Sequence, residues 1–435
     1  MSLDIHHLEA EIIDQYFQDS SDRPWILGFS GGKDSTMLLQ LVWNALKKFE
    51  KSALNRPIYI VCNDTLVENP KIVQFIEKTL KKIEKAATLQ SLPFFVERTK
   101  PRLEDTFWVN LIGKGYPAPN KIFRWCTERL KINPTTRFIV EKINEKGEVI
   151  ILLGTRSEES ANRARSIKRY DSGQRLRKHI LPNAYVFGPL KDVSTEEVWQ
   201  YLLQINPPWG GTNRDLITLY RNASGGDCPL VIDTTTPSCG SSRFGCWVCT
   251  VVKKDKSMDA LIENGEEWME PLQDIRDFLV ETRDNQELYR EKRRRDGTEK
   301  EGVWGPYKPA VRAKFLEMIL KAQKVIYQDQ GVELITQQEM VAIQLTWFRE
   351  GLFKNRVSDI YNKIYKTKLD MSKHDEKFRK EAELLKKSCK EEPEDFELIQ
   401  ELLALQKTKT LMIRKRGLLN DIEARLEEHI KSTGE

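Results

Sequence analysis

The first half of the chain alternates short apolar runs with helix-forming stretches. The apolar runs occupy residues 25–29, 58–61, 92–96, 149–153 and 185–189. Residues 3–18 and 70–89 are predicted to form helices, and the sequence Ser-Thr-Glu-Glu at 194–197 opens another in the manner of a capping box. Continuous apolar runs are typical of parallel strands that are buried on both faces. We therefore expect an α/β fold in which a parallel sheet carries helices on both faces.

The second half has helical periodicity, few glycines and high charge. Residues 267–295 are predicted to form one helix with an apolar stripe and a basic end. Further helices are predicted at residues 310–328, 336–350, 355–365 and 375–431. Residues 293–309 form a basic loop with Trp304 and Tyr307, which either contacts a nucleic-acid backbone or serves as a solvated linker.

These patterns divide the chain into four parts. They are an N-terminal helix (1–20), an α/β domain (21–224), a cysteine-rich segment (225–255) and a helical domain (256–435). The 435 residues are 40% hydrophobic and 31% charged, which is typical of a soluble globular protein. No apolar run approaches the length of a membrane span, and the N-terminus is too polar for a signal peptide, so we expect a cytoplasmic protein without a membrane partner. The net charge of +5 permits nucleic-acid binding without requiring it.

A glycine-containing turn follows the first predicted strand and precedes a predicted helix. The turn consists of Ser30, Gly31, Gly32, Lys33, Asp34 and Ser35. Glycines let a backbone approach an anion closely, and a helix N-terminus offers free N–H groups and a positive dipole end. With two hydroxyls and a lysine added, the turn is predicted to hold phosphate groups. The spacing differs from that of a Walker A loop, and the alternative is an ordinary strand-to-helix turn.

Polar residues also follow the second and fourth predicted strands. Asp64 could face a nucleotide or its Mg²⁺, or else cap the next helix. Gly154, Arg156 and Arg163 come after the fourth strand, and guanidinium groups suit phosphate recognition. The basic stretch 156–178 indicates either a phosphate-rich partner or a solvated charged helix.

Cys126 lies between Arg124 and Arg129, with Lys131 close by in sequence. Neighbouring cations lower the pKa of a thiol and favour the reactive thiolate. We therefore predict that Cys126 is chemically active, the alternative being a buried structural cysteine.

Four further cysteines predict a metal site. They are Cys228, Cys239, Cys246 and Cys249, in the spacing C-x10-C-x6-C-x2-C. Zinc usually prefers two paired CxxC motifs, and only one pair is present, so we favour a [4Fe–4S] cluster over a structural zinc ion. Cys126 could replace Cys228 as a ligand.

Several of these segments resemble known families. The hexapeptide SGGKDS resembles the PP-loop of the N-type ATP pyrophosphatases, which include sulfonucleotide reductases and tRNA thiolases. The stretch FRWCTERLKINP is similar to the Cys-Cys-x-x-Arg-Lys segment of sulfonucleotide reductases, with Trp125 in place of one cysteine. The sequences CPLVIDTTTPSCG and RFGCWVCTVV resemble DndC-type proteins of bacterial DNA phosphorothioation systems, and this resemblance covers roughly residues 20–255.

The resemblance implies an ATP pyrophosphatase and sulfurtransferase with ATP, Mg²⁺ and a [4Fe–4S] cluster. Such an enzyme adenylates a DNA backbone phosphate and replaces a non-bridging oxygen by sulfur. Its implied catalytic residues are Lys33, Asp34, Cys126 and Arg156. Its implied partners are DNA, a cysteine desulfurase as sulfur donor, and other proteins of the phosphorothioation system.

Three alternatives stay open. A sulfonucleotide reductase needs a mobile C-terminal cysteine in a Glu-Cys-Gly context, and only Cys389 is available, in a different context. A tRNA thiolase would apply the same chemistry to RNA. A non-catalytic nucleotide-sensing scaffold is the third alternative, and release of pyrophosphate would separate it from the enzymes.

Overall fold

The computed structural model describes residues 3–19, 22–170, 173–223, 245–294, 298–350 and 356–369, with scattered positions from 383 to 427. Within it the chain forms two compact units, one made of Met1–Pro101 with Trp125–Glu270, the other of Arg102–Arg124 with Pro271–Glu435. Several predicted features lie outside the described residues. They are Cys228, Cys239, the side chain of Arg163 and much of the predicted helix at 375–431.

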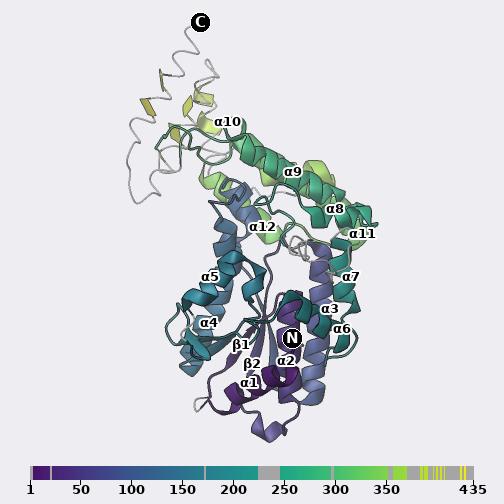
Figure 1. The fold of residues 1–435 in the computed structure, drawn as a ribbon. Coiled ribbons are helices and arrows are strands. Elements are labelled where there is room, and N and C mark those ends of the chain that lie inside the picture. The colour runs from purple at the N-terminus through teal and green to yellow at the C-terminus, as the bar shows by residue number, and fades with distance from the viewer. Residues whose placement is uncertain are drawn as a thin grey trace. The chain divides into compact units, whose positions relative to one another are not determined.

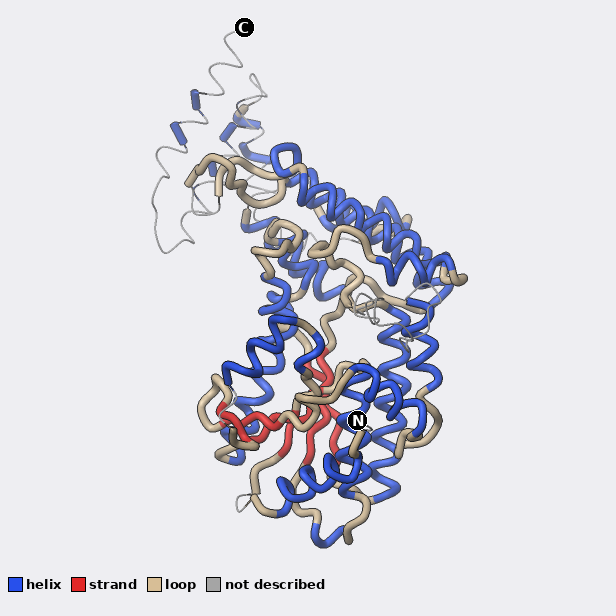
Figure 2. The backbone as a smooth tube through the Cα atoms, viewed as in Figure 1, coloured by secondary structure: helices blue, strands red, loops and turns tan. Residues whose placement is uncertain are grey.

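The first unit contains a six-stranded sheet (Figures 1 and 2). Its strands are β1 (Trp25–Gly28), β2 (Ile58–Asn63), β3 (Phe94–Thr99), β4 (Val149–Leu152), β5 (Leu176–Lys178) and β6 (Ala184–Phe187). They run in the order β3-β2-β1-β4-β6-β5, with every neighbouring pair parallel except β5 and β6. The predicted α/β fold is confirmed, with five of the strands where the apolar runs stand. The edge strand β5 was not predicted, because Leu-Arg-Lys carries no apolar run.

Alternate residues of the central strands face opposite sides of the sheet. Trp25 and Leu27 of β1 enter a core cluster on one face, and Ile26 enters a second cluster on the other. The first cluster takes its helical residues from α1 (Ile5–Phe17), α2 (Lys33–Leu46), α3 (Pro70–Gln90), α6 (Thr195–Gln204) and α7 (Arg214–Ala223). The second takes them from α4 (Asn133–Lys146). A parallel sheet needs this double cover, which buries its apolar strands.

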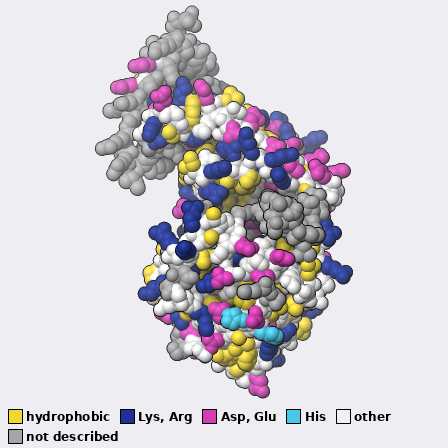
Figure 3. All heavy atoms as spheres, viewed as in Figure 1, with side chains coloured by type: hydrophobic (Ala, Val, Ile, Leu, Met, Phe, Trp, Pro, Cys, Tyr) yellow, Lys and Arg dark blue, Asp and Glu magenta, His cyan; other side chains and the backbone are white. Residues whose placement is uncertain are grey.

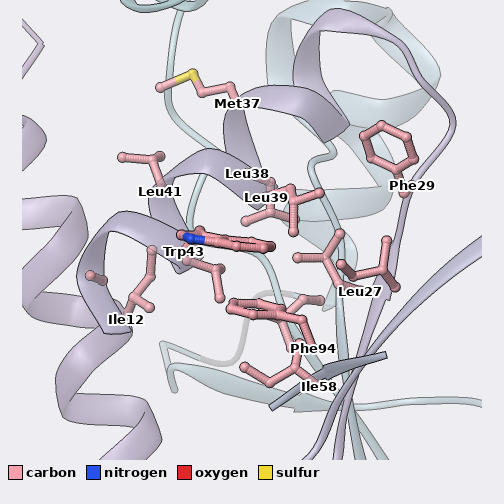
Figure 4. Packing of buried hydrophobic residues seen from close by; sticks show 14 of the residues in the cluster. Ile12, Leu27, Phe29, Met37, Leu38, Leu39, Leu41, Trp43, Ile58 and Phe94 are labelled. Atoms are coloured by element: carbon pink, nitrogen blue, oxygen red, sulfur yellow. The ribbon is translucent and has the colours of Figure 1, made fainter. Parts of the chain in front are cut away.

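The first cluster has an aromatic centre. Figure 4 shows Trp43 of α2 flat against Phe94 of β3, and the ring centroids are 4.4 Å apart with 6° between the planes. Both residues are buried, and Trp43 also donates its indole N–H to Gln90 Oε1 at 2.9 Å. This packing fixes α2, and with it the turn at the start of α2, against the sheet.

The second unit is helical. It contains most of α9 (Glu270–Asp284), then α10 (Gln286–Tyr289), α11 (Pro309–Gln330), α12 (Gln337–Arg349) and α13 (Val357–Tyr365). Residues 102–124 belong to this unit, and their backbone carbonyls accept hydrogen bonds from side chains of α11 and α12. Ile112 O accepts from Arg312 Nε and from Trp347 Nε1, each at 2.8 Å. In the part of the chain that the structure describes, no helix is long and apolar enough to cross a membrane.

Two predictions for this unit are wrong. The helix predicted at 267–295 is interrupted, because α9 ends at Asp284 and Arg290 forms a bridge with Tyr307. Tyr307 was expected in an exposed loop but is 1% exposed. Its hydroxyl oxygen accepts from Ala118 N at 3.0 Å and lies 2.9 Å from Thr282 Oγ1. Tyr307 is therefore a core residue and not a platform for nucleic acid.

Candidate active site

The α/β unit has a cavity of about 560 Å³ at the carboxyl ends of its central strands. Residues that follow β1, β2 and β4 line it. The chain runs outward from β1 to β2 and β3 on one side, whereas β4 lies on the other side of β1. Such a switch point, outside the carboxyl ends of the strands, is where open α/β sheets bind their ligands.

The predicted phosphate-binding turn, residues 30–35, lines this cavity and is organised by its own hydrogen bonds. Ser30 N donates to Ser35 Oγ at 3.2 Å, and Ser35 Oγ donates to Gly32 O at 3.1 Å. Gly31 has φ +71°, and a Cβ there would lie 2.5 Å from a side-chain carbon of Ile76. The turn therefore holds its shape without a ligand, and glycine is required where α3 packs closely on it.

Asp34 is held between two cations. Its Oδ2 accepts from Lys33 Nζ at 2.9 Å, and its Oδ1 from Arg156 Nε at 2.6 Å. Arg156 is 1% exposed, and it also donates to Val193 O at 2.9 Å and to Thr195 Oγ1 at 3.0 Å. We expected Arg156 to offer its guanidinium to phosphate. In the structure Arg156 lines the cavity and these bonds make it position Asp34, while its contact with phosphate stays a prediction.

Gly154 and Asp64 both help to set the course of the backbone near the cavity. A Cβ on Gly154 would lie 2.9 Å from the carbonyl oxygen of Asp34, so glycine lets the β4 loop pass the start of α2. Asp64 Oδ1 accepts from Leu66 N at 2.8 Å, and its Oδ2 lies 3.4 Å from Lys100 Nζ. Asp64 is not among the lining residues of the cavity. Asp64 therefore forms a turn, and it does not cap the next helix as considered above, because the N-cap of α3 is Asn69.

The Cys246–Cys249 turn is attached to the loop that follows β2. Cys249 N donates to Cys246 O at 3.0 Å, Trp247 N donates to Val67 O at 3.0 Å, and Cys246 forms a bridge with Glu68. Trp247 is buried, which anchors the turn. Cys246 and Cys249, two of the predicted metal ligands, therefore lie near the carboxyl end of β2, which borders the cavity.

Glu68 and Lys131 connect the cavity with the cysteines. Both line the cavity, and Lys131 Nζ lies 3.5 Å from Glu68 Oε1. The Cys246 Sγ lies 3.9 Å from the same oxygen and 3.4 Å from Thr65 Oγ1. Sequence reasoning noted Lys131 only as a neighbour of Cys126 and missed Glu68, which no motif marks.

The family model of the phosphoadenosine phosphosulfate reductase domain matches residues 24–252, more than half of the chain. The chain belongs to this family. The family consists of nucleotide-utilising enzymes of sulfur transfer. A curated relative, an uncharacterized protein of Methanocaldococcus jannaschii, is 29% identical over 231 residues. The match covers 53% of this chain and 37% of the relative, so the chain spans little more than a third of that protein's length.

Three solved structures overlap with this phosphoadenosine phosphosulfate reductase-domain protein. A phosphoadenylyl-sulfate reductase from Candida auris, in a phosphate complex, is 13% identical with a TM-score of 0.29 and covers 46% of this chain and 87% of that one. A Candida glabrata FMN adenylyltransferase with FAD and inorganic pyrophosphate is 15% identical with a TM-score of 0.28, at 46% and 57% coverage. A U34-tRNA thiolase from Methanococcus maripaludis with its [4Fe-4S] cluster is 13% identical with a TM-score of 0.28, at 64% and 80% coverage. Overlaps this weak say nothing about the substrate of this chain.

Two thiols of the predicted metal site, those of Cys126 and Cys246, have a raised pKa. Burial raises the pKa of Cys126, and the nearby Cys249 raises it further, against the opposing effects of Thr127 and Lys131. Burial likewise raises the pKa of Cys246 to about 12, with Glu68 as the second cause. The prediction that Cys126 has a lowered pKa is therefore wrong, because burial outweighs the lowering effect of Lys131.

The three described cysteines of the predicted site suit a metal group by chemistry and proximity. Cys249 interacts electrostatically with both Cys126 and Cys246, so the three thiols are gathered in one place. Among the described residues, no three Cys, His, Asp or Glu side chains are placed to hold a single metal ion.

Proposed function

We propose that this protein is a PP-loop ATP pyrophosphatase and sulfurtransferase that replaces a non-bridging oxygen of a DNA backbone phosphate by sulfur. The observation that carries the proposal is the shared wall between the cavity and the cysteines. Glu68 and Lys131 line the cavity that holds the phosphate-binding turn, and Glu68 also contacts Cys246. A phosphate group activated in the cavity would thus lie next to sulfur chemistry.

In the first step, residues 30–35 bind the phosphates of ATP with Mg²⁺. An oxygen of the DNA phosphate attacks the α-phosphorus, an O–P bond forms, and the bond to pyrophosphate breaks. Lys33 stabilises the charge that develops on the departing pyrophosphate. Asp34, fixed by Arg156, holds the Lys33 ammonium in place at 2.9 Å.

In the second step, sulfur at the oxidation level of sulfide attacks the adenylated DNA phosphorus, a P–S bond forms, the bond from that phosphorus to the oxygen of AMP breaks, and AMP leaves with the oxygen. Three of the five cysteines at 126, 228, 239, 246 and 249 would hold a [4Fe–4S] cluster, and Cys126, Cys246 and Cys249 are those in the described part of the chain. When bound, such a cluster would offer its iron without a cysteine ligand as a site for sulfur. Lys131 is close enough to Cys126 and Cys246 to interact electrostatically with both, so it would stabilise negative charge on sulfur during transfer.

DNA as the substrate rests on the resemblance of residues 225–255 to DndC-type proteins, and the mildly positive net charge of +5 is compatible with it. On the face drawn in Figure 3, Lys and Arg side chains are interspersed with Asp and Glu. The proposal further includes a cysteine desulfurase as sulfur donor, other phosphorothioation proteins as partners, and a cytoplasmic location.

A second candidate is a sulfonucleotide reductase, which the family description favours. It would reduce an adenylated sulfate and release sulfite, and it would need no ATP. A tRNA thiolase would share the ATP chemistry and differ in its nucleic acid.

The test of the proposed function measures two products. Purified protein should convert ATP to AMP and pyrophosphate, and both Ser30→Ala and Lys33→Ala should lower the rate by at least roughly a hundredfold, as expected for groups that stabilise transition-state charge. Lys100→Ala is the matched control, because Lys100 pairs with Asp64 and does not line the cavity. Mass spectrometry of DNA from cells with and without the gene should find sulfur-containing dinucleotides only in the former. ADP with orthophosphate as products would contradict the proposal, and sulfite release from an adenylated sulfate would favour the reductase.

A further inference from the structure

A tyrosine from α7 reaches the first amide of the phosphate-binding helix. Lys33 N donates to the Tyr220 hydroxyl oxygen at 3.3 Å. A Cβ on Gly32 would lie 3.3 Å from the same oxygen, so the hydroxyl rests directly against the turn. Tyr220 lines the cavity and is 9% exposed. No motif in the sequence indicates this contact, since Tyr220 stands outside every motif and lies 187 residues from Lys33.

The tyrosine is held by a rigid support. Its ring meets Trp199 of α6 edge to face, with centroids 5.0 Å apart. Asn213 lies just before α7 and is buried, and its side-chain amide both accepts and donates hydrogen bonds. It accepts from Gln40 Nε2 at 2.8 Å and donates to Leu202 O at 2.8 Å. The start of α7 is therefore fixed to both α2 and α6, and the hydroxyl position is built into the fold.

In the proposed function, the Lys33 amide is also one of the donors that would bind phosphate. It lies at the N-terminus of α2, where the helix dipole and the unpaired N–H groups favour an anion. A neutral phenol oxygen is a weaker acceptor than a phosphate oxygen, because charged acceptors form the stronger hydrogen bonds. The two acceptors compete for the same donor, and the phosphate has the advantage of charge.

We infer that Tyr220 is an internal competitor for the phosphate site. The Tyr220 hydroxyl oxygen accepts the hydrogen bond of the Lys33 N–H, which a phosphate oxygen would otherwise accept. The pyrophosphate part of a nucleotide displaces this hydroxyl on binding. Tyr220 thereby sets the affinity of the turn for polyphosphate and, through Trp199, reports whether the turn is occupied. This inference rests on the phosphate-binding role in the proposed function, but it does not depend on the DNA substrate or on sulfur transfer.

The experiment measures binding of inorganic pyrophosphate and of a non-hydrolysable ATP analogue to the full chain by calorimetry. Tyr220→Phe should lower the dissociation constant roughly two- to tenfold, the range expected when one competing hydrogen bond is removed. Tyr201→Phe is the matched control. Tyr201 is a buried tyrosine of α6 whose hydroxyl accepts from Asn44 Nδ2 at 3.4 Å, and it does not line the cavity. Its dissociation constant should equal that of the native protein.

A spectroscopic readout accompanies the calorimetry. Pyrophosphate should change the tryptophan fluorescence of the native protein, and Trp199→Phe should remove that change. The midpoint of thermal unfolding of Trp199→Phe shows whether this variant is folded. A dissociation constant for Tyr220→Phe that is unchanged or raised would overturn the inference, and a raised value would identify the hydroxyl as a donor to phosphate. If neither the native protein nor Tyr220→Phe binds pyrophosphate or the analogue, the phosphate-binding role itself fails, and the inference fails with it.

Discussion

The phosphate-binding turn and the cysteine site border one cavity but are built in opposite ways. The turn is a contiguous hexapeptide whose hydroxyls and amides bond one another, and its charged Asp34 is paired with both Lys33 and Arg156. The cysteine site joins residue 126 and residues 246–249 to the loop at 65–68. Burial raises the pKa of Cys126 and of Cys246. The turn is therefore complete before its ligand arrives, whereas a metal group bound by Cys126 and Cys246 would have to replace their protons.

This difference predicts which perturbations each region tolerates. The turn depends on close backbone packing and on buried ion pairs, so it should fail by steric or electrostatic damage to the fold. The cysteine site depends on its ligand, so it should fail by loss of that ligand while the rest of the unit stays folded.

The largest effect is expected for Cys246→Ser. Cys246 contacts Glu68 and Thr65 at the wall of the cavity, and its turn is fixed by backbone bonds that a serine would keep. Protein purified without oxygen should lose most of its iron and acid-labile sulfide, because a hydroxyl is a poor substitute for a thiolate ligand. The dissociation constant of Cys246→Ser for pyrophosphate should stay within roughly twofold of the native value, because the substitution removes no hydrogen bond of the phosphate-binding turn.

Cys389→Ser is the control for this experiment, because Cys389 lies in the other compact unit. It should retain the full iron content. Unchanged iron in Cys246→Ser would remove this residue from the ligand set. Colourless native protein with an equimolar amount of zinc would instead identify a structural zinc site.

The sequence predicted the fold and the turn well because both depend on local signals. The apolar runs identified five strands, and SGGKDS identified the start of α2. What it could not predict depends on residues far apart in the chain. Nothing near Arg156 shows that its guanidinium is buried against Val193 and Thr195, and nothing near residues 102–124 shows that Arg312 and Trp347 bond to their backbone. The predicted low pKa of Cys126 failed for the same reason, because burial is a property of the folded chain.

A smaller but still large effect is expected for Arg156→Ala, which tests whether the turn depends on its buried ion pair. The change removes the bonds to Asp34, Val193 and Thr195 together and leaves Asp34 with Lys33 as its cationic partner. Losing these bonds should lower the unfolding free energy by at least roughly 3 kcal/mol, because a hydrogen bond to a charged group contributes about 1.5–3 kcal/mol and the acceptors Val193 O and Thr195 Oγ1 lose their donor. Urea unfolding of the α/β unit, followed by tryptophan fluorescence, measures the loss.

Arg98→Ala is the matched control for Arg156→Ala. Arg98 also makes two close ion pairs, with Glu77 and Glu84, but its side chain is 29% exposed and both partners are 42% exposed. Exposed pairs contribute about 0–1 kcal/mol, so the control should shift the urea midpoint only slightly. Equal shifts for the two variants would show that Arg156 does not support the turn.

The smallest effect is expected for Gly154→Ala, which tests the close approach of two backbones. The added Cβ would lie 2.9 Å from Asp34 O and 3.1 Å from Asp34 C, and backbone atoms cannot swing aside as a side chain can. Overpacking of this kind costs about 1–3 kcal/mol, and it should also weaken pyrophosphate binding because the start of α2 must shift. Gly188→Ala is the matched control, since Gly188 follows β6 at the same edge of the sheet and its nearest neighbour, Leu153 O, would lie 3.8 Å away. Both changes reduce the entropy of the unfolded chain alike, so the difference between the two variants isolates the steric contact. If Gly154→Ala matched Gly188→Ala in both urea midpoint and pyrophosphate affinity, the turn would not depend on this approach, and the contrast with the cysteine site would rest on the ion pair alone.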